Sequence, residues 1–107
     1  MEEIIKGMTD LIVRETNPRM IILFGSQARG QTSQNSDVDL LIVQDGETLQ
    51  REGRWLILGR LYRLLADFHT SIDLLLYSYE EFESWRTSIN HVVARALREG
   101  KVLYARS

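Results

Sequence analysis

The sequence predicts an α+β fold, a small mixed sheet of three to four strands covered by helices mainly on one face. Apolar residues recur at helical spacing near the N-terminus, which indicates an amphipathic first helix. Three short apolar runs of strand length follow, with helical patterns between and after them. This order of elements suggests a small mixed sheet whose other face can stay open, and an open sheet face is where a site could lie.

The first half of the chain reads as helix, strand, turn and strand. Apolar residues on one face predict a helix over residues 4–12, and Asn17-Pro18 should end it, because the residue before proline disfavours the helical region. Residues 20–24 form a buried strand. A helical turn over residues 27–29, stopped by Gly30, should lead into a polar loop over residues 31–36.

The middle of the chain predicts two strands separated by one long helix. Residues 38–43 read as a strand, and a turn around Asp45-Gly46 covers residues 44–48. A helix is expected from residue 49 to residue 66, with a third strand over residues 72–77.

The last third of the chain predicts helices and an edge strand. Ser78 and Glu81 have the spacing of a capping box, in which each side chain bonds the backbone of the other residue. Residues 89–97 show a further helical face, and Gly100 is placed to end it. Residues 101–104 can then return as a short edge strand.

Length and composition limit the classes of protein that fit. With 107 residues, the chain is expected to form one domain over residues 1–107. Thirteen basic and fifteen acidic residues give a net charge of −2, which argues against a nucleic-acid binder driven by bulk charge. The sequence contains no cysteine, which excludes disulfides and thiolate metal sites. Without a basic, apolar leader or a long apolar stretch, we expect a cytoplasmic protein that does not enter the membrane.

Three aspartates carry the pattern that indicates chemistry. Asp37 and Asp39 lie two residues apart at the start of a predicted strand, so both side chains leave the same face. Two carboxylates held side by side repel each other unless a cation lies between them, and Mg²⁺ prefers such oxygen ligands. Asp73 interrupts an apolar strand, and it would join the other two if the second and third strands are neighbours.

Three carboxylates can bind two metal ions, which would activate an attacking oxygen and neutralise charge on the leaving group. We expect Asp39 to bridge the ions. Asp73 is the expected general base, or else the ligand that orients an acceptor hydroxyl. Taken alone, Asp-x-Asp more often marks a solvated turn, and Asp73 could be a structural ion-pair partner.

Gly25, Ser26 and Arg29 form a candidate phosphate site at the end of the first strand. Glycine lets a phosphate approach the backbone, and free N–H groups at the start of a helical turn attract an anion. The Ser26 hydroxyl adds a donor. Arg29 could reach the phosphates or could equally bridge to a carboxylate of the domain itself.

These motifs together resemble the minimal nucleotidyltransferases of the DNA polymerase beta-type nucleotidyltransferase superfamily. The resemblance rests on Gly25-Ser26, ten intervening residues and then Asp37-x-Asp39, with the later Asp73. It extends to Phe24-Gly25-Ser26-x-Ala28-Arg29-Gly30, Ser36-Asp37-Val38-Asp39-Leu40 and the ending Glu99-Gly100-Lys101-Val102-Leu103-Tyr104. It covers nearly the whole chain and implies a polymerase beta-like fold.

The resemblance implies that Asp37, Asp39 and Asp73 bind Mg²⁺ and that Gly25-Ser26 holds the phosphates of ATP. It also implies an antitoxin in stable complex with a HEPN-domain ribonuclease toxin. Such an antitoxin silences the toxin by transferring AMP to one of its tyrosines. Self-association is also compatible with a small core.

Two alternatives remain open. The domain could neutralise a partner by contact alone, although three intact aspartates argue against a degenerate site. It could instead modify a small molecule or an RNA end. Relatives of those kinds usually carry a second domain or a basic RNA-binding domain, which neither the length nor the net charge of this chain supports.

Other conspicuous residues fit ordinary structural roles. His69 and His91 have no second histidine at a metal-binding spacing. The tryptophans and tyrosines are expected in the core or on a partner surface. One predicted helix carries a basic set that is typical of a solvated face and only weakly suggests an acidic partner or RNA, namely Arg51, Arg54, Arg60 and Arg63.

Overall fold

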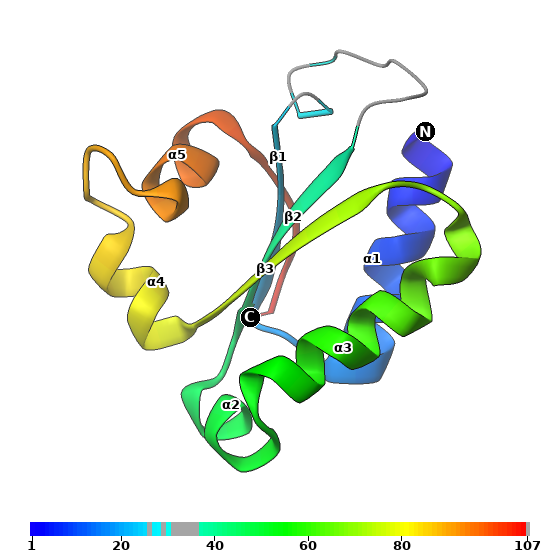
Figure 1. The fold of residues 1–107 in the computed structure, drawn as a ribbon. Coiled ribbons are helices and arrows are strands. Elements are labelled where there is room, and N and C mark those ends of the chain that lie inside the picture. The colour runs from blue at the N-terminus through cyan, green and yellow to red at the C-terminus, as the bar shows by residue number, and fades with distance from the viewer. Residues whose placement is uncertain (26, 29, 31–36, 107) are drawn as a thin grey trace.

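A four-stranded mixed sheet forms the centre of the protein, in a computed structural model that describes residues 1–25, 27, 28, 30 and 37–106. The strand order is β3-β2-β1-β4, and Figure 1 shows the sheet between two groups of helices. β2 and β3 run parallel, whereas β1 is antiparallel to both β2 and β4. The predicted sheet is confirmed, with β1 (Met20–Phe24), β2 (Val38–Gln44), β3 (Ile72–Ser78) and β4 (Lys101–Ala105).

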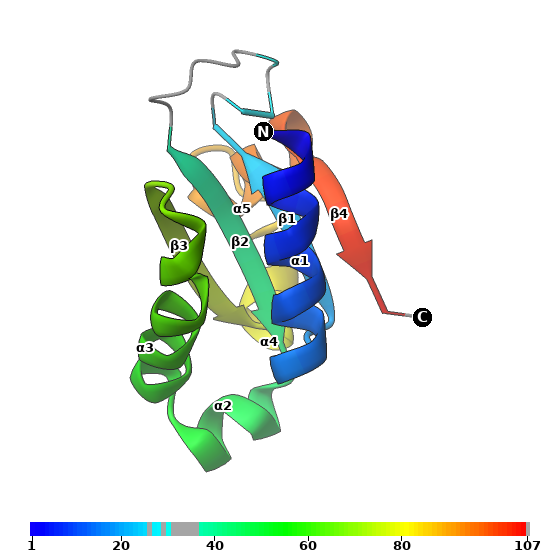
Figure 2. The same ribbon diagram turned by 90° about the vertical axis from the view of Figure 1, so that its right-hand side faces the viewer.

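The two longer helices lie on one face of the sheet, where Figure 2 shows α1 in front of the strands. They are α1 (Glu2–Thr16) and α3 (Arg54–Leu65). Asn17 ends α1 in the left-handed region with φ 46°, directly before Pro18, as predicted. No helix in the described part of the chain is long and apolar enough to cross a membrane. The core on this face includes Met8, Ile12, Ile21, Val38, Leu40, Ile57, Leu61, Leu65, Leu74 and Leu76.

The second face is also covered, which corrects the expectation of an open face. Two short helices, α4 (Tyr79–Trp85) and α5 (Val92–Glu99), lie there, on the other side of the sheet in Figure 1. They enclose a smaller buried cluster of Ile22, Leu41, Val43, Phe82, Val93 and Ala96. β2 therefore buries side chains on both faces and reads as a continuous apolar run, so its sequence does not show which face helices cover.

The predicted helix over residues 49–66 is in fact two helices. α2 (Gly46–Glu52) begins inside the segment predicted as a turn, and Gly53 separates it from α3. Gly53 has φ 90°, a conformation that breaks the helical path and favours glycine. After α3 the chain tightens into a short 3₁₀ helix, η1 (Ala66–Phe68).

The C-terminal third differs from prediction only at the start of α5. Ile89 precedes that helix and is 80% exposed, rather than lying on a helical face. The helix begins after His91, whose Nδ1 accepts a hydrogen bond from the Val93 N–H at 3.1 Å. Gly100 follows the helix as predicted, and its N–H donates to the Ala96 carbonyl at 2.7 Å.

The predicted capping box at the start of α4 is confirmed. Glu81 N–H donates to Ser78 Oγ at 3.0 Å, and Ser78 N–H donates to Glu81 Oε1 at 2.8 Å. Arg54 from α3 also donates to Glu81 Oε1, at 2.6 Å. Burial raises the pKa of Glu81, but these bonds and the Arg54 charge outweigh it and hold the pKa below the ordinary 4.5.

A lowered pKa makes the contribution of Glu81 to stability dependent on pH. Because the folded protein favours the carboxylate, this contribution is fully present above the unfolded pKa and is lost as pH falls through the folded value. Glu81→Gln keeps an acceptor for the capping box but removes the charge. Urea denaturation should therefore show wild type more stable than Glu81→Gln at about pH 7, with the difference shrinking toward about pH 3.5.

Ser78→Ala serves as the control for this prediction. It removes the hydroxyl cap and should cost about 1 kcal/mol, with less dependence on pH than Glu81→Gln, because that hydroxyl is the smallest of the causes that lower the Glu81 pKa. A difference between wild type and Glu81→Gln that stays constant over this range would contradict the assigned ionic role.

Candidate active site

Asp39 and Asp73 occupy one row of the sheet, at the end where β2 and β3 begin. The parallel register pairs Asp39 with Asp73, and the antiparallel register pairs Asp39 with Phe24. Residues paired in register project to the same face of a sheet. The two carboxylates therefore leave neighbouring strands side by side, Asp39 half-buried and Asp73 exposed.

Alternation along the strands explains why both aspartates reach this face. Val38 and Leu40 are buried in the core beneath α1 and α3, and Leu74 lies in the same core. Side chains between such positions must point to the opposite face. The predicted neighbouring of the second and third strands is confirmed by the β2–β3 pairing.

Asp37 lies at the residue immediately before β2 and is exposed. Val38, the next residue, donates its N–H to the Ser71 carbonyl at 2.9 Å, which ties this end of β2 to the start of β3. The backbone at Asp37 is therefore held beside the segment that leads to Asp73.

Gly25 lies against the Asp39 carboxylate, directly after β1. Its φ is 75°, a left-handed conformation that side chains rarely adopt. A Cβ built on Gly25 would overlap Oδ2 of Asp39 and lie 3.2 Å from its Cγ. The glycine is therefore required both by its conformation and by the close approach of the carboxylate.

The remaining predicted phosphate-binding residues, Ser26 and Arg29, lie outside the described residues. Near them, Gly30 donates its N–H to the Gln27 carbonyl at 3.2 Å, so a turn follows β1 as predicted.

The donor set suits a hard cation, although the side chains do not close around one point. Asp39 and Asp73 offer carboxylate oxygens from adjacent backbone positions, which fits magnesium. Within residues 1–25, 27, 28, 30 and 37–106, no three His, Asp or Glu side chains form a group that could hold a metal ion. The backbone positions of Asp39 and Asp73 therefore suit a magnesium site better than the arrangement of the side chains does.

Tyr62 supports the candidate site and was not singled out from the sequence. Its Oη accepts a hydrogen bond from the Leu74 N–H at 2.9 Å, at the residue that follows Asp73. This bond joins α3 to β3, the edge strand of the sheet that the described residues form. From the sequence, the tyrosines were expected only in the core or on a partner surface, because residue spacing carries no information about a distant backbone partner.

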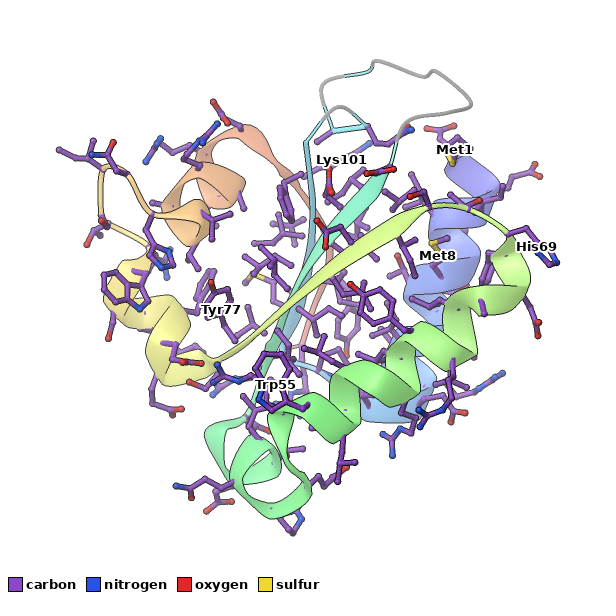
Figure 3. The ribbon with its side chains drawn as sticks, viewed as in Figure 1. Met1, Met8, Trp55, His69, Tyr77 and Lys101 are labelled. Carbon is purple, nitrogen blue, oxygen red and sulfur yellow. The ribbon has the colours of Figure 1, made fainter. Side chains whose placement is uncertain are left out.

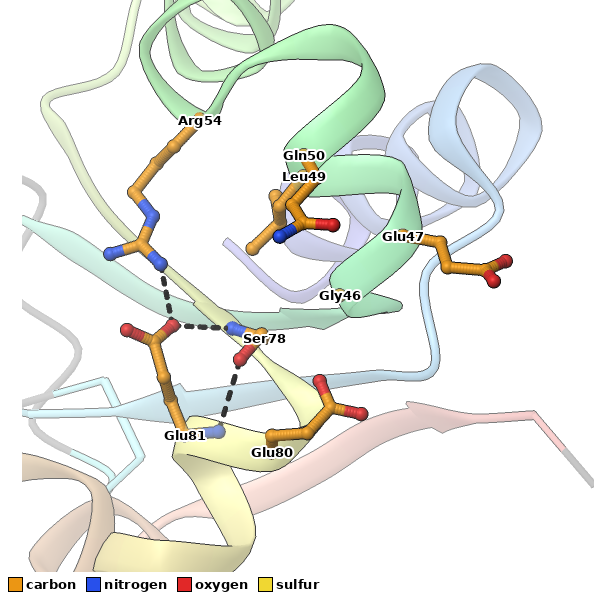
Figure 4. Close-up of a pocket in the computed structure, with 8 residues that line it drawn as sticks. All are labelled: Gly46, Glu47, Leu49, Gln50, Arg54, Ser78, Glu80 and Glu81. Atoms are coloured by element: carbon orange, nitrogen blue, oxygen red, sulfur yellow. Dashed lines mark hydrogen bonds and ion pairs between the residues drawn. The ribbon is translucent and has the colours of Figure 1, made fainter.

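A separate cavity of about 550 Å³ lies at the opposite end of β2 and β3, between α2 and α4 (Figure 4). Its polar wall includes the capping box and the Arg54–Glu81 ion pair, whose nitrogen and oxygen are 2.6 Å apart. Each of these groups has a structural partner, and none comes from the predicted site. The aspartate row, rather than this cavity, is the candidate active site.

The histidines have structural positions. His69 ends η1 with φ 52° and is exposed, on the α3 side of the molecule in Figure 3. His91 caps α5, and its ring stacks on Trp85 with centroids 4.4 Å apart. The Tyr77 ring meets His91 edge-on, with centroids 5.9 Å apart.

Comparison with known proteins decides the family. Residues 6–107 match the family described as polymerase beta, nucleotidyltransferase. The chain belongs to this nucleotidyltransferase family. A relative from Methanocaldococcus jannaschii, provisionally named protein adenylyltransferase MJ0604, is 36% identical over 87 residues. That match covers 80% of this chain and 78% of the relative. The reaction class of this chain is therefore nucleotidyl transfer, as its motifs predict.

Solved structures support the same fold. A nucleotidyltransferase from Sulfolobus solfataricus, also provisionally named, aligns over 99% of this chain and 81% of its own, with a TM-score of 0.64 and 19% identity. A toxin–antitoxin structure with AMP-PNP aligns over 95% of this chain and 74% of its own, with a TM-score of 0.58 and 24% identity. A variant of the toxin–antitoxin pair MntA–HpeT has a TM-score of 0.56 and 22% identity, with the same coverage. This chain therefore has the polymerase beta-like nucleotidyltransferase fold.

The contact between Gly25 and Asp39 makes a testable prediction. Gly25→Ala should abolish nucleotidyl transfer, because the new methyl group must displace the Asp39 carboxylate. The left-handed conformation should also cost roughly 1–2 kcal/mol of stability. Thermal unfolding and a transfer assay with labelled nucleotide measure the two effects.

Gly30→Ala is the matched control for this prediction. Gly30 has a similar φ of 78°, but a Cβ there would meet no atom of the described residues within 4 Å. It should show the conformational cost alone and retain transfer. Equal activity losses in the two variants would show that the contact with Asp39 is not the cause.

Proposed function

We propose that this protein transfers AMP from ATP to a tyrosine of a HEPN-domain ribonuclease toxin and so acts as its antitoxin. The observation that carries the proposal is the pairing of Asp39 with Asp73, beside Gly25, at one end of the sheet. In this role the protein would work in the cytoplasm.

The relatives support a protein acceptor and a toxin partner. The M. jannaschii relative carries the name of a protein adenylyltransferase, and two similar structures are toxin–antitoxin pairs. One of those pairs was solved with AMP-PNP, an ATP analogue, which favours ATP as the nucleotide here.

The proposed reaction is a displacement at the α-phosphorus of ATP. The acceptor oxygen forms a bond to that phosphorus, the bond to the β-phosphate oxygen breaks, and pyrophosphate leaves. Asp73 accepts the proton of the acceptor hydroxyl, or orients that hydroxyl, because it is the exposed member of the aspartate row. Asp39, half-buried against Gly25, has the more fixed position.

Mg²⁺ would be held by Asp37, Asp39 and Asp73, with Asp39 shared between two ions. The ions would neutralise negative charge on the transferred phosphate and on pyrophosphate. The backbone of Gly25-Ser26 and the Arg29 guanidinium would bind the phosphates of the nucleotide.

Neutralisation by contact alone is the second candidate. One observation favours it, since the described side chains form no metal-holding group of three. The acceptor could also be a small molecule or an RNA end. A transfer assay with labelled ATP separates the proposed function from these alternatives, because only the proposed function places label on the toxin.

The double variant Asp37→Asn, Asp39→Asn should lower AMP transfer to a cognate HEPN-domain toxin by at least about a hundredfold. It should fold, and could gain thermal stability, because it removes repulsion between neighbouring carboxylates. Labelled ATP and mass spectrometry of the toxin measure the transfer. Asp73→Asn should lower it as well.

Growth of cells that express the toxin gives the second readout. The double variant should bind the toxin yet fail to protect the cells. A variant that protects as well as wild type would establish neutralisation by contact and contradict the catalytic proposal.

A further inference from the structure

The outer side of α3 carries large apolar side chains that the core does not use. Trp55 and Leu56 are 79% and 75% exposed, and Tyr62, two turns along the helix, is 38% exposed. We call these three residues the α3 stripe. Figure 3 shows the Trp55 indole outside the ribbon of α3. The opposite side of the helix, with Ile57 and Leu61, is buried in the core, so the helix has a fixed orientation and the stripe is a rigid surface.

The charge of α3 differs from that of the whole chain. The helix contains three arginines and no acidic residue, in a chain of net charge −2. Arg54 pairs with Glu81, and Arg60 lies 3.9 Å from Glu52. Arg63 forms no ion pair with any residue in the described part of the chain. The surface beside the stripe therefore has positive charge to offer a partner.

The stripe is connected to the aspartate row through Tyr62. Its hydroxyl bonds the backbone of Leu74, next to Asp73, at 2.9 Å. Trp55 precedes Tyr62 by seven residues, about 10 Å along a helix. The Asp73 side chain leaves the sheet on the face opposite α3, and β3 is the edge strand of the described sheet. A protein bound along the stripe would therefore reach the Asp73 carboxylate by passing around the β3 edge.

We propose that the α3 stripe is the surface on which the acceptor protein docks before it is modified. The partner segment should present apolar side chains to Trp55 and Leu56, and carboxylates to Arg60 and Arg63. This proposal rests on the proposed function, since it names the surface that brings the acceptor to the site. It also assigns a role to the arginines of α3, which take no part in the proposed reaction.

The chemistry of the surface favours a protein over a nucleic acid. Large exposed apolar side chains at the centre, flanked by charge, are typical of protein interfaces, where Trp, Tyr and Arg contribute most of the affinity. Binding to a phosphate backbone relies on many cations, whereas among the described residues Arg63 is the one arginine of α3 outside an ion pair.

The test uses the full chain and a cognate HEPN-domain toxin as the partner. Binding is measured by calorimetry with the stripe intact, with Trp55→Ala and with Arg63→Glu. The matched control is Ile89→Ala, which truncates an apolar residue that is 80% exposed, next to α5 on the other side of the sheet. Trp55 and Ile89 are both exposed, so circular dichroism should show that each variant folds as wild type does.

Trp55→Ala should raise the dissociation constant at least about tenfold, and Ile89→Ala should change it less than about twofold. Arg63→Glu should weaken binding and reduce its dependence on salt. In the transfer assay, Trp55→Ala should raise KM for the partner and leave kcat unchanged at saturation, because Trp55 does not touch the reacting groups.

The outcomes separate this proposal from the proposed function. Wild type that binds the partner through Trp55 but transfers no AMP would keep the docking surface and reject the function. Wild type that transfers AMP, with Trp55→Ala equally active and equally tight, would keep the function and reject the docking surface. Wild type that does not bind this partner rejects both.

Two results would show that something other than the acceptor protein binds the α3 stripe, and either would overturn the proposal. If Trp55→Ala changes the sedimentation of the isolated chain but not partner binding, the stripe joins two copies of this chain. If Arg63→Glu abolishes binding of a single-stranded RNA oligonucleotide and leaves partner binding unchanged, the surface belongs to RNA.

Discussion

The parallel pairing of β2 with β3 is the constraint on which the site depends. It fixes Asp39 beside Asp73 at the level of the backbone, whatever the rotamers of the two side chains. The register is itself fixed by burial, because Val38, Leu40 and Leu74 must enter the core under α1 and α3. A slip of one residue would exchange the faces and bury a carboxylate in that core, at a high cost in free energy.

The same constraint gives the nearby residues their roles. Gly25 must lack a side chain because the Asp39 carboxylate occupies the space that a Cβ would need. Tyr62 satisfies a backbone N–H at the edge of β3, so the edge strand that carries Asp73 is attached to α3 by a hydrogen bond as well as by apolar packing. β2 and β3 therefore both stabilise the fold and carry the candidate catalytic residues. α3 connects these strands to the surface that we propose for a protein partner.

Local patterns in the sequence were enough to predict the strands, the end of α1 and the capping box, because each depends on neighbours within a few residues. The alternation in β2 and β3 also predicted that Asp39 and Asp73 would share a face. Two features depend on contacts between distant segments and could not be predicted in this way. They are the packing of α4 and α5 on the second face, and the bond from Leu74 to Tyr62. The break at Gly53 was missed for a local reason, because a single glycine inside a helical pattern does not show that it takes a φ of 90°.

The most direct test of the account locates the metal–nucleotide site on the protein in solution. Mn²⁺, a paramagnetic substitute for Mg²⁺, is added with AMP-PNP while the backbone amide resonances are recorded. The account predicts that Gly25, Asp39 and Asp73 lose intensity first, while Gly46 and Ser78, at the far end of the sheet, keep theirs. Loss centred on Gly46 and Ser78, or no loss at the aspartate row, would contradict the assignment of this row as the active site.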